Sequence, residues 1–446
     1  MSFRNVMNSR LPFCCSAVWA AAIAFAPSLH AEQDGPYDPA FGNVGRTWID
    51  VSPDPNDISY KLIRLPNGNL FMAGICGNVG TCAAWLTPAG ALASGYGNNA
   101  GNGTVYLSAF AGWPNDTFGI TDAAALPDGR VVVVVNRGAV GGYIAMLKAD
   151  GSGLDPSVGN GAGYVAPSFD ARWVRRAGDG FVVVGTDDGS PVSIVVARYD
   201  ATLHPDTSFG TSGSRTLTFA SDAQAQGMTV QKDGKIVLVG AVFTAPTTLL
   251  IARLTAGGTP DPAFGVNSDG IYLNNFGTGA IGNDIVEDRQ GRLVYVGQAI
   301  NGVSSKWLVG RLLGGASVDP AFNGGQARSY TIFDTSQDYN PQACCVGLQP
   351  DDRIVVAGTM DRNIYYKYFA FSRFRDDGSF DSTFGNGGQS YGDMSSAADP
   401  RSDSPNSMVV MPGGIVLGGS TTDTSPETRF VATKVRIDQL FRGHFE

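Results

Sequence analysis

The segment 227–265 carries three short apolar runs separated by turn residues, which predicts antiparallel strands. Met228–Val230 and Ile236–Val239 flank the pair Asp233-Gly234, and such a pair between β-branched runs indicates a two-residue type I′ hairpin with positive φ at the glycine. A third apolar run, Leu249–Leu254, follows after a loop. Because Ile236–Val239 shows no alternation of apolar and polar residues, we expect other sheets to cover both faces of that strand.

This segment is one unit of a repeat. It closes with Asp261-Pro-Ala-Phe264-Gly265, and copies of that motif, two of them degenerate, start at positions 38, 93, 155, 206, 261, 319, 381 and 438. A hairpin turn recurs between successive motifs, at 67–68, 128–129, 179–180, 233–234, 290–291, 351–352 and 413–414. Eight motifs therefore bracket seven units. Each unit has four predicted strands, and we place the hairpin turn between the second and third.

A unit of this length with four strands is typical of a β-propeller blade, and a closed ring of blades exposes no long sheet edge. The sequence thus predicts an all-β fold, a seven-bladed β-propeller of four-stranded antiparallel blades. We assign residues 1–31 to a signal peptide and 32–446 to a single propeller domain. Its repeats end near 93, 155, 206, 261, 319, 381 and 438.

The repeat resembles that of the bacterial delta-60 repeat proteins. Their unit has a Gln-Pro-Asp-Gly-Lys-Ile-Val-Val-Ala-Gly-like hairpin, an Ala-Arg-Tyr-like strand and a Leu-Asp-x-x-Phe-Gly-like close. The resemblance covers nearly everything after about Gly35, and it implies a propeller-like fold without an established activity or catalytic residue. The matching segments are Gln231–Gly240, Gln349–Gly358, Ala197-Arg198-Tyr199 and Ala252-Arg253-Leu254, and the local departures are Val158 for the aromatic residue, Ala93 for the acid and Asn323 for the glycine.

The N-terminal residues have the layout of a secretory signal peptide. Arg4 and Arg10 precede the apolar run Leu11–Ala26, and Ser28-Leu29-His30-Ala31 follows it. We place cleavage after Ala31, and an uncleaved anchor is the alternative. Removing two arginines and no acid takes the formal charge from −9 to −11. This charge disfavours nucleic-acid binding, and the interpretation is a secreted or periplasmic monomer without a membrane span in the mature chain.

Four cysteines remain after the signal peptide, an even number for an oxidising compartment. Cys76 and Cys82 flank a loop between two predicted strands, and we expect a disulfide between them. Cys344 and Cys345 are adjacent on a predicted strand, where neighbouring side chains point to opposite faces. Free thiols are therefore the favoured state of this pair, and a vicinal disulfide is the alternative.

The repeated Asp-x-x-Phe-Gly motif is interpreted as structural and not as a ring of metal ligands. Its aspartate is expected to accept backbone N–H groups of the turn, its glycine to take a left-handed conformation, and its aromatic ring to pack between blades. After the signal peptide only His204 and His444 remain, so catalysis or metal binding by clustered histidines is disfavoured. We predict no metal site and no cofactor, with calcium at Asp54, Asp57, Asp187 and Asp188 as a weaker alternative because their spacing is not that of an EF-hand.

Loops on the face opposite the repeated turns differ between units, and binding residues tend to lie on such loops. Aromatic and acidic residues occur together there, a combination suited to sugars and to protein interfaces. The candidate ligand contacts are Trp113, Asp116, Tyr339, Asp361, Tyr365 and Tyr366.

The leading functional hypothesis is a non-catalytic binding module for an extracellular glycan or protein partner. The alternatives are a polysaccharide lyase or glycosidase that uses loop carboxylates, and a structural surface protein. The C-terminal segment 440–446 is either part of an eighth motif that latches the ring or a short tail of the kind found on some secreted bacterial proteins.

Overall fold

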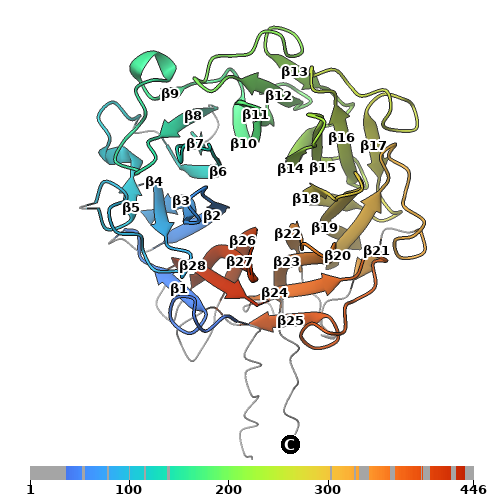
Figure 1. Cartoon of the computed structure of the whole chain (residues 1–446). Coiled ribbons are helices and arrows are strands. Elements are labelled where there is room, and N and C mark those ends of the chain that lie inside the picture. Colours follow the sequence, from blue (N-terminus) through green and yellow to red (C-terminus); the bar gives the residue numbers. More distant parts are fainter. Residues whose placement is uncertain are drawn as a thin grey trace, which may run out of the picture. The chain divides into compact units, whose positions relative to one another are not determined.

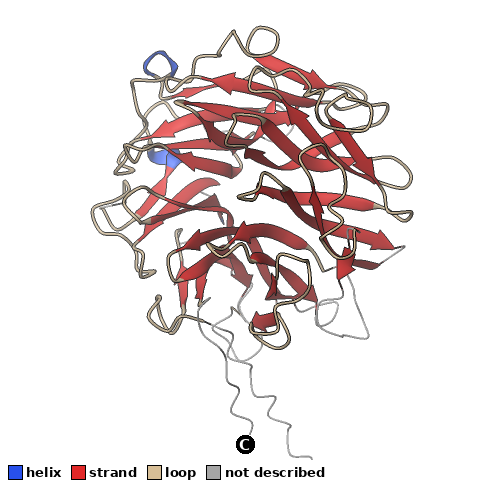
Figure 2. Ribbon diagram, turned by 45° about the vertical axis from the view of Figure 1, so that its right-hand side comes forward, coloured by secondary structure: helices blue, strands red, loops and turns tan. Residues whose placement is uncertain are grey.

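The computed structural model describes residues 37–52, 56–77, 80–99, 101–114, 117–137, 141–301, 304–325, 328–330, 341–361, 367–392, 394, 402–422 and 428–436. Strands make up nearly all of the regular structure in these residues (Figure 2). The short 3₁₀ helices η2 (Leu107–Ala109) and η4 (Gly159–Gly161) interrupt the loops. The all-β prediction is therefore confirmed.

Consecutive strands form four-stranded antiparallel sheets. Five of them are separate in the described residues: β2 (Asp57–Arg64), β3 (Leu70–Cys76), β4 (Gly80–Leu86), β5 (Thr104–Tyr106); β6 (Gly119–Ala125), β7 (Val131–Asn136), β8 (Gly142–Leu147), β9 (Tyr164–Val165); β10 (Asp170–Ala177), β11 (Gly180–Thr186), β12 (Ile194–Tyr199), β13 (Ser214–Leu217); β14 (Ala223–Val230), β15 (Ile236–Val242), β16 (Thr248–Leu254), β17 (Ile271–Asn274); β18 (Ala280–Glu287), β19 (Leu293–Asn301), β20 (Ser304–Leu312), β21 (Arg328–Tyr330). The remaining strands are β22 (Ala343–Leu348), β23 (Ile354–Asp361), β24 (Lys367–Phe374), β25 (Gln389–Gly392), then β26 (Ser402–Met411), β27 (Gly414–Thr422), β28 (Thr428–Val435) with β1 (Arg46–Ile49), and one parallel bridge between Lys367 and Ser402 joins these two groups.

The sheets are arranged in a ring with the first strand of each innermost (Figure 1). The inner strands contact one another in the order β2, β6, β10, β14, β18, β22 and β26, and β26 contacts β2 again. The last sheet takes its outer strand from the other end of the chain, because β1 pairs with β28 with Arg46 opposite Thr433. Propeller-like closure thus depends on pairing between distant segments.

The strand that follows each Asp-x-x-Phe-Gly motif belongs to the same sheet as the strand before it. In the sheet β14-β15-β16-β17, Ile251 of β16 lies opposite Tyr272 of β17. The predicted strand order is therefore wrong by one. The hairpin turn joins the first and second strands, and the motif joins the third and fourth. Since neighbouring strands are antiparallel, both turns still open at the same end of the sheet, as predicted.

The hairpin turn between β14 and β15 is one residue longer than predicted. The N–H of Gln231 donates to the carbonyl of Lys235 at 2.8 Å, and the N–H of Gly234 donates to the carbonyl of Gln231 at 2.9 Å. Gly234 has a φ of 81°, as predicted, whereas Asp233 does not have a positive φ. The turn is therefore of the three-residue kind, a type I turn followed by a left-handed glycine, and not type I′.

We predict that Gly234→Val lowers the free energy of unfolding by about 1–2 kcal/mol, because a side chain is strained at this φ. The added Cβ would also lie 3.2 Å from the Cβ of Ala256. Urea denaturation measures the change. Gly257→Ala is the control, because Gly257 lacks a positive φ and has only Thr255 Oγ1, at 3.8 Å, near its added Cβ. Equal stability of the two variants would contradict the prediction.

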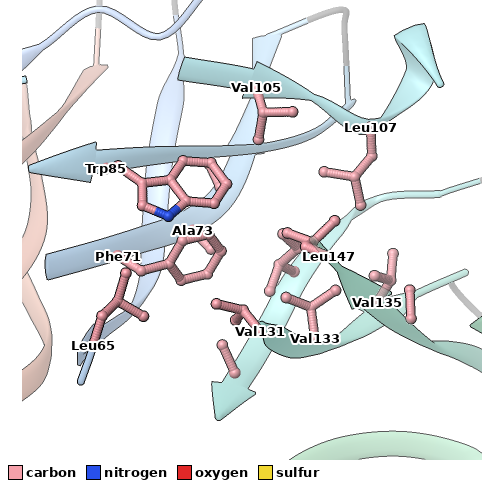
Figure 3. Packing of buried hydrophobic residues seen from close by; sticks show 14 of the residues in the cluster. Leu65, Phe71, Ala73, Trp85, Val105, Leu107, Val131, Val133, Val135 and Leu147 are labelled. Atoms are coloured by element: carbon pink, nitrogen blue, oxygen red, sulfur yellow. The ribbon is translucent and has the colours of Figure 1, made fainter. Parts of the chain in front are cut away.

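The core lies between neighbouring sheets. The second strand of a sheet contributes side chains to the core layers on both of its faces. In β7, Val131, Val133 and Val135 pack with the sheet β2–β5 (Figure 3), whereas Val132 and Val134 pack with the sheet β10–β13. In β15, residues 236 and 238 likewise join one cluster and residues 237 and 239 the next. The prediction that both faces of Ile236–Val239 are covered is confirmed.

The Asp-x-x-Phe-Gly motif is held by its aspartate and by an arginine of the preceding strand. Asp261 Oδ1 accepts the N–H of Ala263 at 3.0 Å, and Asp261 Oδ2 lies 2.7 Å from Arg253 Nε. The guanidinium of Arg253 lies 4.6 Å from the centre of the Phe264 ring, and this ring is buried between two sheets. The same ion pair recurs at Arg198–Asp206, Arg311–Asp319 and Arg373–Asp381. The structural interpretation of the motif is therefore confirmed.

Candidate functional site

Every inner strand has a β-bulge near its middle, which directs polar side chains toward the axis of the ring. These bulges displace the backbone register by one residue and bring an extra side chain to the axis. The bulge residues are Tyr60, Thr121, Arg172, Gln226, Asn283, Cys344 and Asn406. Several of these polar groups join adjacent sheets: Thr121 Oγ1 donates to the carbonyl of Arg172 at 2.9 Å, and Asn406 Nδ2 donates to that of Ser59 at 2.8 Å.

Two hollows in the described part of the chain lie along the axis of the ring. The first, here called the mouth pocket, has a volume of about 630 Å³ and opens at the end of the ring where β3 and β4 are joined. The second, here called the central cavity, has a volume of about 520 Å³ and is lined by residues of all the inner strands. Trp173 and Asn406 line both hollows, so the two are neighbours. The mouth pocket is lined by Tyr60, Ile75, Phe118, Gly119, Thr121, Asn136, Arg172, Trp173 and Asn406.

Exposed aromatic rings line the mouth pocket and do not line the central cavity in the described residues. Tyr60 is 39% exposed and Phe118 is 59% exposed. The Tyr60 side chain is brought there by the bulge of β2, and the N–H of Phe118 donates to the carbonyl of Asn136 at 2.8 Å. Arg172 Nη2 lies 2.9 Å from Asp170 Oδ2, which orients its guanidinium. The pocket thus combines two accessible ring faces with a fixed cation and amide groups.

A buried carboxylate in the central part of the ring holds two cations. Asp122 is completely buried; its Oδ1 lies 2.7 Å from Lys61 Nζ, and its Oδ2 lies 2.6 Å from Arg175 Nη1 and accepts the N–H of Val174 at 2.8 Å. Burial alone would raise the pKa of Asp122, but the charges of Arg175 and Lys61 outweigh it and lower this pKa. Burial and repulsion from Arg175 lower the pKa of Lys61.

A second carboxylate, Asp284, lines the central cavity. It accepts the N–H of Val346 at 2.9 Å and that of Ile285 at 2.9 Å. Burial raises the pKa of Asp284, and its hydrogen bonds do not offset this. The two carboxylates of the axis therefore have pKa values shifted in opposite directions.

Cys344 and Cys345 form a vicinal disulfide beside the central cavity, so the favoured prediction of free thiols is wrong. The physical reason is the bulge of β22, whose register shifts between Ala343 and Cys345. Two residues of a bulged strand oppose one residue of the partner strand, so the alternation that would send the two sulfurs to opposite faces is interrupted here.

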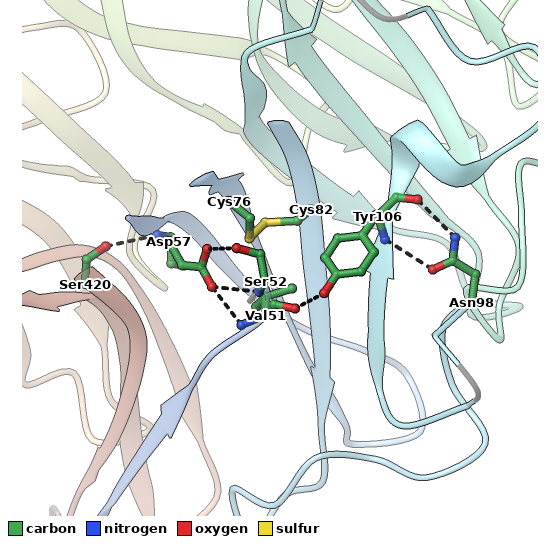
Figure 4. The surroundings of a disulfide bond; sticks show 9 residues. Val51, Ser52, Asp57, Cys76, Cys82, Asn98, Tyr106 and Ser420 are labelled. Carbon is green, nitrogen blue, oxygen red and sulfur yellow. Dashed lines mark hydrogen bonds between the residues drawn. A yellow bond between two sulfur atoms is a disulfide. The ribbon is translucent and has the colours of Figure 1, made fainter. Parts of the chain in front are cut away.

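The disulfide between Cys76 and Cys82 is present as predicted, and both residues are completely buried. It lies beside a buried network around Asp57, drawn in Figure 4. The carboxylate of Asp57 accepts the N–H groups of Val51 and Ser52 at 2.7 and 3.0 Å and the Ser52 hydroxyl at 2.9 Å. The hydroxyl of Tyr106 donates to the carbonyl of Val51. Asp57, considered above as a calcium ligand, thus orders the loop before β2, and burial raises its pKa.

Of the ligand contacts predicted from sequence, Trp113 is the one whose side chain the structure describes. Trp113 is only 5% exposed, and its indole packs against Tyr143 and Tyr164, so the exposed aromatic surface expected there is not present at this ring. Asp116, Tyr339, Tyr365 and Tyr366 lie outside the described residues. Asp361 ends β23, and its side chain is outside the described part as well.

The residues of the axis were missed, although some of them carry a signal in the sequence. Asp122 is a charged residue inside the otherwise apolar strand β6, whereas Lys61 and Arg175 stand among other charged residues of β2 and β10. A charged residue in a strand buried on both faces requires a partner, and aligning the repeat units would have placed these residues near one another. Tyr60 and Phe118 have no comparable signal, because an aromatic residue in or beside a strand is ordinary.

No group of three or more His, Cys, Asp and Glu side chains in the described residues is arranged to hold a metal ion. Among the same residues, we find no helix with the length and apolarity needed to cross a bilayer.

Comparison with known proteins supports a propeller-like repeat. Residues 231–264 and 349–384 match the family model described as a domain of unknown function (DUF5122) beta-propeller. These are two of the segments that carry the resemblance to delta-60 repeats. A search of curated proteins found no match.

The solved structures to which this chain is similar are distant from it. An extracellular domain assigned to a one component system of B. thetaiotaomicron is 10% identical, with a TM-score of 0.44 over 86% of this chain, and this chain spans only 39% of its length. A protein of unknown function from Dyadobacter fermentans is 12% identical, with a TM-score of 0.40 over 88% of this chain and 99% of its own. The polysaccharide lyase Uly1 is 11% identical, with a TM-score of 0.44 over 90% of this chain and 92% of its own. Similarity at this level supports no conclusion about activity.

Proposed function

We propose that this chain is a secreted or periplasmic, monomeric seven-bladed β-propeller over residues 32–446, which binds a glycan at the mouth pocket without catalysis. A signal peptide at 1–31 would direct its export. Support for an oxidising compartment comes from the disulfides Cys76–Cys82 and Cys344–Cys345. Support for seven blades comes from the contacts between successive inner strands and from the return of β26 to β2.

The observation that carries the binding proposal is the composition of the mouth pocket. Its volume of about 630 Å³ is in the range of small-molecule sites. Tyr60 and Phe118 offer apolar ring faces, and Arg172, Asn136 and Asn406 offer polar groups around them. Apolar faces with a few placed polar groups suit a sugar ring, which has apolar C–H surfaces and hydroxyl edges.

A glycosidase or lyase is the second candidate, and the carboxylates of the axis are the reason to keep it. Asp122 and Asp284 have pKa values shifted in opposite directions, a pattern found in acid and base pairs. We rank this candidate second because Asp122 is completely buried and both of its oxygens are occupied by Lys61, Arg175 and a backbone N–H.

We predict that Tyr60→Ala and Phe118→Ala each weaken glycan binding by about 1 kcal/mol or more, as loss of an aromatic anchor does. A glycan array with the purified protein selects the ligand, and calorimetry measures the variants. Phe243→Ala is the matched control, since Phe243 is similarly exposed and lines neither hollow. Equal affinity of Phe118→Ala and Phe243→Ala would contradict the assignment of the pocket, and release of shortened products during incubation would favour the enzyme.

A further inference from the structure

The central cavity is positively charged in a chain whose formal net charge is −9. Four cationic side chains line it: Lys61, Arg64, Arg175 and Arg176. One acid, Asp284, is among the residues that line the cavity. A second acid, Asp122, forms ion pairs with two of the lining cations, Lys61 and Arg175. Two carboxylates therefore face four cations, and a cleft lined by one sign of charge concentrates ions of the opposite sign.

The ion pairs inside the cavity do not balance these charges. Asp122 is shared by Lys61 and Arg175, and the charge of Asp284 also acts on both of these cations without an ion pair to either. Arg64 has no ion-pair partner among the described residues, and Arg176 Nε donates to the neutral carbonyl of Gly178 at 2.9 Å. Asp284 accepts backbone N–H groups, and no ion pair to it is present in the described part of the chain.

A cation in a partly buried site that shares its counter-charge with a second cation is stabilised further when another partner of opposite sign is supplied. Lys61 has a side chain only 13% exposed, and that of Arg175 is 26% exposed. Water therefore solvates these cations incompletely, and an anionic group entering the cavity would gain both an ion pair and hydrogen bonds from them.

We propose that the central cavity binds the carboxylate or sulfate groups of an acidic saccharide, with Lys61, Arg175 and Arg64 as the cations that select it. This inference rests on the proposed glycan-binding function and names its ligand class. The mouth pocket and the central cavity share Trp173 and Asn406, so a sugar stacked on Tyr60 or Phe118 is positioned to place an acidic substituent or a neighbouring acidic unit into the cavity.

The test compares hexagalacturonate, a sulfated hexasaccharide, neutral maltohexaose and sodium sulfate by calorimetry at low and high ionic strength. We expect at least one acidic oligosaccharide to bind about tenfold or more tighter than maltohexaose, with an advantage that shrinks as salt screens the charges. The two acidic probes distinguish carboxylate from sulfate as the preferred group. If sodium sulfate binds as tightly as the sulfated hexasaccharide, the cavity takes an ion only and the saccharide proposal is overturned.

The decisive variant is Lys61→Met, which removes one cation and leaves Asp122 paired with Arg175 and with the N–H of Val174. We expect it to lose about tenfold in affinity for the acidic hexasaccharide, whereas Lys61→Arg keeps most of it. Arg289→Gln is the matched control, because it removes the same charge from an exposed side chain outside both hollows. Thermal melting shows that each variant is folded before binding is measured.

Failure of this inference is distinguishable from failure of the proposed function. If maltohexaose binds as tightly as the acidic probes and Phe118→Ala weakens it, glycan binding stands and the acidic ligand class is wrong. If no oligosaccharide binds the wild-type protein, on the array or in calorimetry, both are overturned. Unchanged affinity of Lys61→Met for an acidic probe that does bind would overturn the role of the cavity cations alone.

Discussion

Replacing Asp122 by alanine should lower the free energy of unfolding by about 3 kcal/mol or more. The substitution leaves Lys61 and Arg175 in a largely buried site without their shared counter-charge, and breaking one side of a buried ion pair is strongly destabilising. Urea denaturation followed by fluorescence measures the change. The control is Asp128→Ala, whose carboxylate is about half exposed and pairs with Arg130 at the surface, where such pairs contribute about 0–1 kcal/mol.

Further substitution of both cations by methionine should recover part of the lost stability, because the uncompensated charges are then removed as well. A fall of less than 1 kcal/mol for Asp122→Ala would mean that water reaches the two cations more freely than their burial implies.

The same ion pairs predict how stability changes with pH. The pKa of Asp122 is lowered from its ordinary value of 3.8 in the folded protein, so the unfolded chain takes up its proton first as the pH falls. The stabilisation from the ionised carboxylate is therefore fully present above about pH 4 and is lost as the pH falls through the folded-state pKa. Between pH 5 and pH 3, wild-type protein should lose more stability than Asp122→Asn, and parallel curves would contradict this assignment.

Replacing Phe264 by alanine should cost about 3–5 kcal/mol, the range for an aromatic residue removed from a core. The ring is completely buried between the sheets β14–β17 and β18–β21, and its face contacts the Arg253 guanidinium. Thermal and urea unfolding measure the loss. Val266→Ala two residues later is the control, because Val266 is 93% exposed and its loss should change stability by no more than about 0.5 kcal/mol.

A loss below about 1.5 kcal/mol for Phe264→Ala would mean that neighbouring side chains collapse into the space left by the ring. The structural role of the motif would then depend mainly on the Arg253–Asp261 ion pair, which the variant leaves in place.

Much of the fold could be predicted because its signals are local. A turn such as Asp233-Gly234 and an apolar run such as Ile236–Val239 specify a hairpin from neighbouring residues alone. The pairing of an outer strand is different. Ile271–Asn274 follows the motif along the chain, and nothing in its own sequence decides between pairing with β16 and starting the next sheet. The hydrogen bonds to Leu249–Ala252 decide it, and the Arg253–Asp261 ion pair lies in the motif turn that precedes this strand.

The candidate site was harder to predict because it depends on bulges. A bulge changes which side chains face the axis, yet no residue type marks it: the bulge positions hold tyrosine, threonine, arginine, glutamine, asparagine and cysteine. The state of Cys344 and Cys345 was predicted wrongly for this reason. Tyr60 was missed for the same reason, because regular alternation from Ile58 onward does not indicate which face it takes.

Because β1 pairs with β28, the ring cannot close until the ribosome has synthesised nearly the whole chain. Thr433 Oγ1 donates to the carbonyl of Gly45 at 2.8 Å across 388 residues of chain. At a synthesis rate of roughly 5–20 residues per second, the first strand waits on the order of 20–80 s before its partner exists. During that interval β1 is an unpaired strand available to other chains, so a cell that makes this protein benefits from keeping the nascent chain unfolded or chaperoned until its last strands have emerged.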